Sequence, residues 1–450
     1  MASMEEFFEI RRHGSTVSRE VIGGMTTFAT MSYIIFVQPA MLSDAGMDFG
    51  AVMVATCLAA GLATIAMGLI AKYPIALAPG MGENLYFAYV VCGAAGIGGL
   101  GYSWQVALGA VFIAGALFVV LSLFGFREKI IEIFPQSLKS GIAAGIGLFI
   151  AVIGFWWAGI VVRAPSPEGL IQIGTLTEPP VLLALFGLVV TAVLLARRIS
   201  GAILCGIIVT LIVGLATGIV QYHGIAGKPP SISPTFFKLD LRTVFSSVNM
   251  ISVVLIFLFL DLFDTVGTLI GVGQQAGFMV DGRLPRARRA FMCDALGSVA
   301  GATMGTSTVT SYIESAAGVT AGARTGLASV VTGLLFLVAP FFGNLATSVG
   351  EKMYLASGVP VRPVVAPALI IVGSMMMRSL ADVKWKDATE ALPAFLTMAV
   401  MAFTMSITEG IAFGVIAYCI LKLVAGKGKE VHWSMYLIAV ALLARYVFLA

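Results

Sequence analysis

The sequence predicts an all-α polytopic membrane protein with fourteen transmembrane segments. The chain of 450 residues is 59% hydrophobic and only 11% charged, whereas a soluble domain usually carries about 25% charged residues. Apolar windows of roughly 17 to 25 residues, each long enough to cross the bilayer as a helix, recur from Val21 to the C-terminus. Helices are expected because a spanning segment must satisfy its own backbone hydrogen bonds.

The N-terminal residues 1–20 are charged and have no apolar core followed by a small-residue cleavage site, so we expect a cytoplasmic segment and no cleaved signal peptide. We place the spans, in order, at residues 21–41, 51–71, 75–92, 103–124, 138–161, 181–196, 201–220, 248–273, 288–304, 307–321, 325–343, 364–378, 390–405 and 408–425.

Lysine and arginine are unevenly distributed between the loops that these spans leave. Of the 27 basic residues, 20 fall in loops on the side of the N-terminus and six on the other side, with Arg445 left aside. Cytoplasmic loops carry such an excess, which predicts a cytoplasmic N-terminus, a cell (inner) membrane location and an even number of crossings. The apolar segment 431–450 can cross again or lie in the interface, and we leave its topology open.

The longest polar connection, residues 221–247, divides the chain into halves of seven spans. The segments "CLAAGLATIAMG" and "DALGSVAGATMG" share small-residue spacing and a closing Met-Gly. Small residues are common wherever membrane helices pack closely, so the odd number of spans per half is the stronger argument. Seven spans followed by seven place the second copy upside down, and inverted repeats of this kind are typical of secondary transporters.

The third and tenth segments are atypical. In "YPIALAPGMGENLYFAYVV", Pro74 and Pro79 interrupt a regular helix, and only after Asn84 does the run look steadily helical. In "GTSTVTSYIESAAGVTAG", residues 306–311 suit a short strand and residues 315–319 a helix. Irregular backbone survives at membrane depth only where protein or a water-filled cavity covers it. We therefore expect two short strands that meet near the midplane, each leading into a half-helix.

Polar side chains gather at the same places. Carboxylates within the membrane cost about 2.5 to 3.5 kcal/mol each on translocon scales, so they are functional candidates by default. The candidates are Glu83 and Asn84 at the turn of the first broken segment, Thr310 and Glu314 in the second, and Asp261 and Asp264 in the span at 248–273.

Structural roles stay open for some of these acids. Asp261 lies nearly a turn from Asp264 and can be a neighbour of the site, and Glu83 can hold its turn. Asp294 is expected to pair with an arginine of the adjacent run "RLPRARR". Carboxylates without nearby cations suit a substrate that donates hydrogen bonds, or one that arrives with a proton, and they suit an inorganic anion poorly. A buried carboxylate can also carry a proton across.

Aromatic residues near the site, including Phe28, Phe263 and Tyr312, can stack a flat heterocycle, although phenylalanines at helical spacing also serve plain packing. The three histidines lie outside the spans and the five cysteines lack metal-ligand spacing. We expect no metal, no cofactor other than a coupling proton, no enzymatic activity and no nucleic-acid partner. An intramembrane hydrolase would need a nucleophile with a base or a metal set, and we find neither.

Several motifs in order resemble the AzgA-like purine permeases, a branch of the nucleobase:cation symporters related to the uracil and xanthine permeases. They are "APGMGENLYFAY", "FLDLFDTVGTLIGV", "DALGSVAGATMGTSTVTSYIESAAGV", "GARTGLASVVTG" and "EALPAFLTMAVMAFTMSITEGIAFG", and the likeness covers nearly the whole chain.

The resemblance implies a seven-plus-seven inverted repeat with a core domain and a gate domain. By this likeness the core comprises residues 21–124 and 248–343, the gate 125–220 and 344–425, with a cytoplasmic segment 1–20, an extracellular linker 221–247 and a C-terminal segment 426–450. It further implies proton-coupled uptake of adenine, guanine or hypoxanthine by movement of the core against the gate. A homodimer formed through the gate is left open.

The resemblance also assigns site residues. Asp264 matches the acid of the eighth span, Glu314 that of the tenth in a Tyr-x-Glu pattern, and Asn84 the polar residue of the third. Glu83 departs from the pattern, where a small or apolar residue is expected. Thr268 replaces a histidine of the uracil permeases, so coupling is expected to rest on carboxylates, Asp264 and Glu314. The alternatives are a uracil, xanthine or anion carrier of the same fold and a passive channel.

Overall fold

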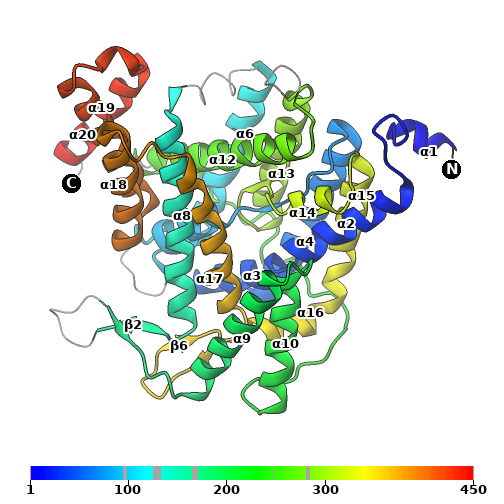
Figure 1. Ribbon diagram of the computed structural model, residues 1–450. Helices are drawn as coiled ribbons and strands as arrows, with labels where there is room; N and C mark the ends of the chain where they lie inside the picture. The colour runs from blue at the N-terminus through cyan, green and yellow to red at the C-terminus, as the bar shows by residue number, and fades with distance from the viewer. Residues whose placement is uncertain are drawn as a thin grey trace. The chain divides into compact units, whose positions relative to one another are not determined.

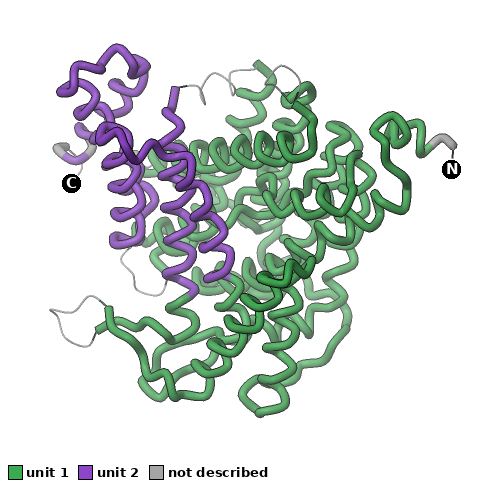
Figure 2. The backbone as a smooth tube through the Cα atoms, viewed as in Figure 1, with its two compact units in different colours: residues 1–124, 155–368 green, residues 125–154, 369–450 purple. Residues whose placement is uncertain are grey.

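The computed structural model describes residues 2–94, 99–124, 133–164, 171–246, 248–279 and 284–448, and helices make up most of them (Figure 1). By their internal contacts the residues fall into two units (Figure 2). Unit 1 comprises residues 1–124 and 155–368, and unit 2 comprises residues 125–154 and 369–450.

The expected core residues 21–124 and 248–343 all lie in unit 1, together with three helices of the expected gate, at Pro179–Ala196, Ala202–Ala216 and Gly343–Gly350. The expected boundary at residue 125 lies outside the described residues. The division into core and gate therefore stays a prediction.

The first half of the chain follows the predicted order of segments. Its elements are α1 (Ala2–Phe7), α2 (Val17–Met31), α3 (Ile34–Asp44), α4 (Phe49–Ala66), β1 (Leu77–Pro79), α5 (Met81–Leu85), α6 (Trp104–Phe124), α8 (Gln136–Trp157), β2 (Val161–Arg163), β3 (Ile171–Ile173), α9 (Pro179–Ala196), α10 (Ala202–Ala216) and α11 (Leu241–Ser246). Wider, π-helical turns extend α4 over Met67–Ala71 and α5 over Tyr86–Val91.

The second half likewise consists of helices with a few short strands. Its elements are α12 (Val248–Gln275), α13 (Ala287–Met304), β4 (Val309–Ser311), α14 (Ser315–Thr320), α15 (Gly326–Val338), α16 (Gly343–Gly350), β5 (Met353–Tyr354), β6 (Pro360–Val361), α17 (Ala366–Met376), α18 (Ala388–Thr404), α19 (Ile407–Val424) and α20 (Trp433–Phe448). Short 3-10 turns lie at Ala339–Phe342, Met377–Asp382 and Gly428–Glu430.

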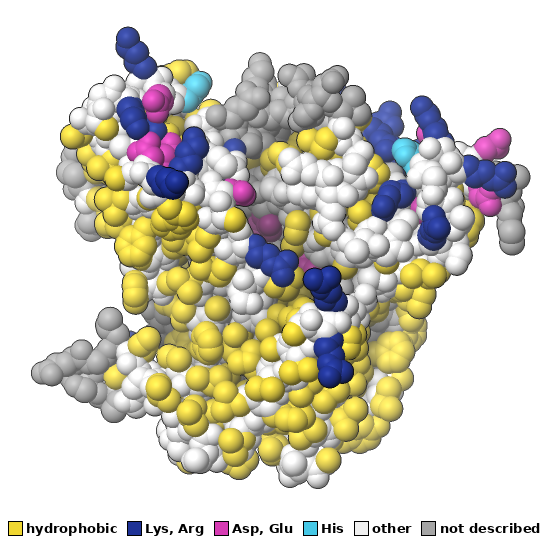
Figure 3. Space-filling view, in the orientation of Figure 1, with side chains coloured by type: hydrophobic (Ala, Val, Ile, Leu, Met, Phe, Trp, Pro, Cys, Tyr) yellow, Lys and Arg dark blue, Asp and Glu magenta, His cyan; other side chains and the backbone are white. Residues whose placement is uncertain are grey.

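Among the described residues, eight helical stretches are long and apolar enough to cross a membrane, which confirms a polytopic membrane fold. The expected spans at 201–220 and 390–405 correspond to the shorter apolar helices α10 and α18. Around α9 and α10 the visible surface is largely hydrophobic (Figure 3). The exposed side chains of these two helices include Phe186, Val189 and Ile212. Such a face suits contact with lipid.

The first expected span, at 21–41, is two consecutive helices. Helix α2 ends at Met31 and α3 begins at Ile34. The backbone N–H of Ser32 still donates to the carbonyl oxygen of Phe28, at 2.8 Å. Tyr33 lies at this junction and is only 1% exposed.

Glycines allow α4 and α15 to pack backbone against backbone. A Cβ at Gly326 would lie 2.0 Å from the carbonyl oxygen of Gly68, and one at Gly333 would lie 2.6 Å from that of Gly61. Close approach between small residues is how membrane helices associate when no hydrophobic force drives them together. The small-residue pattern of "CLAAGLATIAMG" is therefore explained by this contact.

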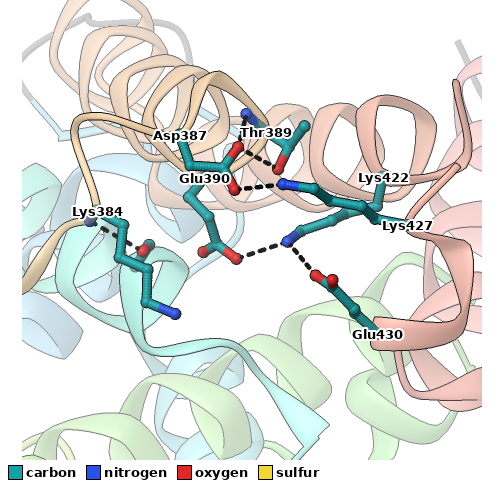
Figure 4. A network of polar contacts seen from close by, with 8 residues as sticks. Lys384, Asp387, Thr389, Glu390, Lys422, Lys427 and Glu430 are labelled. Atoms are coloured by element: carbon teal, nitrogen blue, oxygen red, sulfur yellow. Dashed lines mark hydrogen bonds and ion pairs between the residues drawn. The ribbon is translucent and has the colours of Figure 1, made fainter. Parts of the chain in front are cut away.

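In unit 2, a polar network joins α18, α19 and the turn before α20 (Figure 4). Lys422 of α19 is 2% exposed. Its Nζ lies 2.9 Å from Glu390 Oε1 and 2.8 Å from Glu430 Oε2. Lys427 Nζ lies 2.7 Å from Asp387 Oδ2. The network fastens the start of the C-terminal segment to α18 and α19.

Candidate functional site

The two broken segments meet as an antiparallel strand pair, as predicted. Strand β1 pairs with β4 in the register Leu77 with Ser311 and Pro79 with Val309. The ladder continues through a hydrogen bond from the N–H of Gly80 to Thr308 O and one from the N–H of Tyr312 to Ala76 O, each 2.9 Å. Both strands are fully buried. Helices α5 and α14 therefore begin beside the same two-stranded sheet.

Tyr312 ties the pair together on one side. Its hydroxyl donates to the carbonyl oxygen of Pro79 at 2.5 Å. Pro79 has no N–H, so its carbonyl is the only backbone group that it can offer to the ladder. Tyr312 is one of the predicted aromatic residues, and this hydrogen bond fixes its ring beside the start of α5.

Carboxylates from four elements lie around the strand pair. Asp264 of α12 is half-buried and interacts electrostatically with Glu83 of α5, with Asp294 of α13 and with Glu314 at the start of α14. Glu83 is 1% exposed and Asp294 fully buried. The predicted acids Asp264, Glu83 and Glu314 thus form one cluster, which Asp294 joins.

Glu314 is held by the junction between α2 and α3. The hydroxyl of Tyr33 donates to Glu314 Oε1 at 2.8 Å, and Thr30 Oγ1 lies 3.4 Å from the backbone oxygen of Glu314. Tyr33 is not among the residues predicted from the sequence. Its signal was a tyrosine inside an expected span, which is also common in plain packing.

Asn84 belongs to a second buried polar group, formed with Ser307, Thr306 and Gln38. Its Oδ1 accepts a hydrogen bond from the hydroxyl of Ser307. Gln38 Nε2 donates to Ser307 at 3.2 Å and to Thr306 at 3.0 Å. Within the described part of the chain, Asn84 Nδ2 has no hydrogen-bond partner. Asn84 Nδ2 is therefore a buried donor whose hydrogen bonds are not used by the described residues. Gln38 was missed, although a glutamine within an apolar span was a visible signal.

Thr265 links Asp261 to the strand pair. Its hydroxyl lies 3.2 Å from Asp261 Oδ1, 2.8 Å from Asp294 Oδ1 and 2.7 Å from the hydroxyl of Thr310. Because a hydroxyl has one proton, Thr265 donates to one of these at a time. Asp261 and Thr310 therefore face a network that positions β4 against α12 and α13, and their predicted contact with substrate stays a prediction.

Hydroxyl groups surround the second acid of this network, Asp294, for which an arginine partner is expected. Ser311 Oγ lies 3.4 Å from Asp294 Oδ1, and the hydroxyl of Thr265 lies 2.8 Å from the same oxygen. Ser298 Oγ, 3.4 Å from Asp261 Oδ2, also donates to Val309 O at 2.9 Å. Asp294 thus belongs to the site, which the sequence analysis did not predict.

The predicted aromatic residues have ring neighbours. Phe28 of α2 is half-buried and meets Phe336 of α15 edge to face, with ring centroids 5.1 Å apart. Phe263 of α12 lies nearly parallel to Phe259 at 6.4 Å. Both contacts are compatible with packing. Within the described ranges, no group of three or more His, Cys, Asp or Glu side chains could hold a metal ion.

The sequence of this chain is similar to those of known permeases. The family model of the xanthine/uracil permeases, described as a permease family, matches residues 18–413. The guanine/hypoxanthine permease PbuG of Bacillus subtilis is 46% identical over 99% of this chain and 100% of its own. The adenine permease AdeP of Escherichia coli is 44% identical over 99% of this chain and 96% of its own.

A solved structure shares the fold. The transmembrane domain of the bicarbonate transporter BicA from a cyanobacterium aligns with a TM-score of 0.60 at 15% identity, covering 88% of this chain and 97% of that one. At this identity the likeness concerns the fold alone. The family match covers most of the chain, and its members are transporters and not enzymes. The chain therefore belongs to the xanthine/uracil permease family of nucleobase permeases.

Proposed function

We propose that this protein imports the purine nucleobases hypoxanthine, guanine and adenine together with protons. The observation that carries the proposal is the convergence of Asn84, Asp264 and Glu314 on one buried strand pair. The names of relatives that match nearly the whole chain support the purine class, since PbuG is a guanine/hypoxanthine permease and AdeP an adenine permease.

The chemistry of the cluster suits a purine. Asp264 and Glu314 are carboxylates that accept hydrogen bonds from ring or exocyclic N–H groups. Asn84 Nδ2, which has no partner among the described residues, donates to a ring nitrogen or a carbonyl oxygen. The N–H groups of the substrate are thus matched by carboxylate acceptors on the protein. The amide of Asn84 donates in the opposite direction, to an acceptor on the substrate. Ionised carboxylates would repel an inorganic anion, because both carry negative charge.

The proposal includes a mechanism and a topology. Fourteen spans would form the seven-plus-seven inverted repeat, and a core would move against a gate to carry the substrate across. One carboxylate of the site would bind the coupled proton, and Asp264 and Glu314 are the candidates that the sequence names. The N-terminus would lie in the cytoplasm, with the protein in the inner membrane, and a homodimer through the gate is left open.

Uptake of radiolabelled hypoxanthine by cells that lack their own purine permeases tests the function. We expect accumulation above the external concentration that a protonophore abolishes, and loss of uptake in Asp264→Ala and in Glu314→Ala. Normal proton-dependent uptake by the double variant would contradict the site assignment.

Competition separates the alternatives. Unlabelled adenine, guanine, uracil, xanthine, sulfate and bicarbonate are each added in excess. Inhibition by uracil alone would replace the purine assignment, and inhibition by xanthine alone would replace hypoxanthine, guanine and adenine as the substrates. Inhibition by the anions would replace the nucleobase class. Equilibration without accumulation would indicate a passive channel.

A further inference from the structure

Glu83 differs from three other acids of the site, Glu314, Asp261 and Asp294, in its hydrogen bonding. It is 1% exposed. Within the part of the chain that the structure describes, neither of its carboxylate oxygens has a hydrogen-bond partner. Glu314 accepts from Tyr33, and Asp261 and Asp294 face hydroxyl groups. Among the described residues, only the backbone N–H of Glu83 itself approaches its carboxylate, so Glu83 lies at the site with little that would stabilise a charge.

Glu83 does not cap the start of α5. Glu83 is the third residue of α5, the position from which a glutamate can bond back to the N–H of the residue before the helix. That residue is Gly80, and its N–H donates to Thr308 O of the opposite strand at 2.9 Å. The N–H group that a capping box would use is therefore already bonded within the strand pair, so Glu83 does not form a capping box.

The carboxyl group of Glu83 lies across Gly80. A Cβ at Gly80 would be 2.2 Å from Glu83 Oε2 and 2.7 Å from Thr310 Cγ2. The φ of Gly80 is −70°, which any residue can adopt, so glycine is required here for space and not for backbone conformation. The fold thus leaves room for this carboxyl group beside β4.

The surroundings of Glu83 are acidic. Asp264 of α12, Asp294 of α13 and Tyr312 after β4 interact with it electrostatically. Helix α3 also packs on α5. The one acid of α3, Asp44, is paired with Lys352 and Arg362. An ionised carboxylate with little to stabilise it and beside other acids is strongly disfavoured, so Glu83 is neutral when Asp264 is ionised.

We propose that Glu83 binds and releases the coupled proton, an assignment that rests on the proposed proton symport. Glu83 takes its proton from water on the outer side, and the O–H bond breaks again when the proton leaves to water on the inner side. No other reactant is needed. While Glu83 is neutral, Asp264 keeps its charge and accepts the purine N–H. When Glu83 releases its proton to the inner side, two ionised carboxylates lie side by side, and the water that must solvate them displaces the purine.

This coupling predicts the direction of a pH effect. Purine binding weakens as the pH rises and Glu83 loses its proton, because the pair then cannot present an ionised Asp264 without a second adjacent charge. In Glu83→Gln the side chain is always neutral, so binding stays strong at the pH where wild-type binding has fallen. A glutamate that only holds its turn would leave this pH profile unchanged.

The experiment uses the full chain in proteoliposomes with radiolabelled hypoxanthine. Glu83→Gln and Glu83→Met are compared with the wild type for accumulation under a proton gradient and for exchange with purine on both sides. We expect both variants to exchange purine and neither to accumulate it above the external concentration. Glu20→Gln is the matched control, since Glu20 is a buried glutamate whose oxygens accept the N–H groups of Arg324 and Thr325. It should keep coupled accumulation per inserted molecule.

Each other outcome overturns the assignment. Coupled accumulation by Glu83→Gln would show that the proton binds elsewhere, and loss of coupling in Glu83→Met alone would indicate a hydrogen-bonding role. Loss of exchange in both variants would make Glu83 a substrate contact. If the wild type exchanges purine but does not accumulate it under a proton gradient, the proposed symport is wrong. This result comes from the wild type alone and does not depend on the Glu83 variants.

A measurement on the wild type covers the case in which neither variant inserts. A hydrophobic carbodiimide reacts with protonated, buried carboxyl groups, and mass spectrometry of the peptides locates the product. We expect modification at Glu83 that decreases as the pH rises and that blocks accumulation. Its absence from Glu83 at low pH, in protein that transports hypoxanthine, would overturn the proposal.

Discussion

The hydroxyl of Tyr33 donates a hydrogen bond of 2.8 Å to the carboxylate of Glu314, across 281 positions of the sequence. It joins the break between α2 and α3 to the start of α14. Because the acid lies at a helix start that itself follows β4, the tyrosine sets the position of the carboxylate relative to the strand pair.

Replacement of Tyr33 by phenylalanine removes this donor and keeps the ring. A hydrogen bond to a charged group contributes about 1.5 to 3 kcal/mol, which corresponds to roughly a tenfold or greater rise in the KM for hypoxanthine uptake. Initial rates over a range of substrate concentrations measure it. Tyr436→Phe, which removes a hydrogen bond to Gly428 in unit 2, is the control. An unchanged KM in Tyr33→Phe would mean that Glu314 needs no such support.

Gly80→Ala should abolish transport while the protein still inserts. The added Cβ would overlap Glu83 Oε2 and Thr310 Cγ2, so the carboxyl group of Glu83 must leave its place or β1 must shift. The measurement is uptake per inserted molecule. Gly271→Ala in α12, where the nearest atom would be Ile313 Cδ1 at 3.4 Å, should transport normally. Equal activity of the two variants would argue against a role for this space.

Glu20 is expected to contribute to stability and not to recognition. It is fully buried in α2 and accepts the backbone N–H of Arg324 at 2.9 Å and of Thr325 at 3.1 Å, just before α15. Glu20→Ala leaves these donors without their acceptor, at a cost of roughly 2 kcal/mol or more. Thermal unfolding in detergent should show a lower Tm, and Glu20→Gln a smaller decrease. A Tm equal to that of the wild type would contradict the contact.

The Asp387–Lys427 pair predicts a pH dependence of stability. The hydrogen bond from Lys427, with one from Thr389, lowers the pKa of Asp387 below its ordinary value. Stabilisation by a lowered pKa is complete above the unfolded-state value of about 3.9 and is lost as the pH falls through the folded-state value. The Tm difference between wild type and Asp387→Asn should therefore be present at neutral pH and shrink in acid. Lys427→Met should reproduce it, and a difference independent of pH would exclude the pair as its source.

The two broken segments were predictable because their cause is local. Pro74 and Pro79 cannot continue a helix, and the β-branched and hydroxyl residues of 306–311 favour extended chain. Apolar periodicity likewise located the helices around them. The break at Tyr33 escaped the same reasoning. The run from Val21 to Met41 is mostly apolar, and its threonines and Ser32 are spread over residues 26–32 instead of marking the one position where the helix ends.

By itself, therefore, the sequence determined the membrane class, the order of segments, and the acids Asp264, Glu314 and Glu83 as candidates, since hydropathy and intramembrane charge are properties of single residues and short windows. Only the tertiary structure decided which partners these acids have. Tyr33 beside Glu314, Thr265 between Asp261 and Asp294, and the donor of Gly80 given to Thr308 all join distant positions. Hydrogen bonds of this kind depend on how helices and strands pack, and no short window of sequence contains that information.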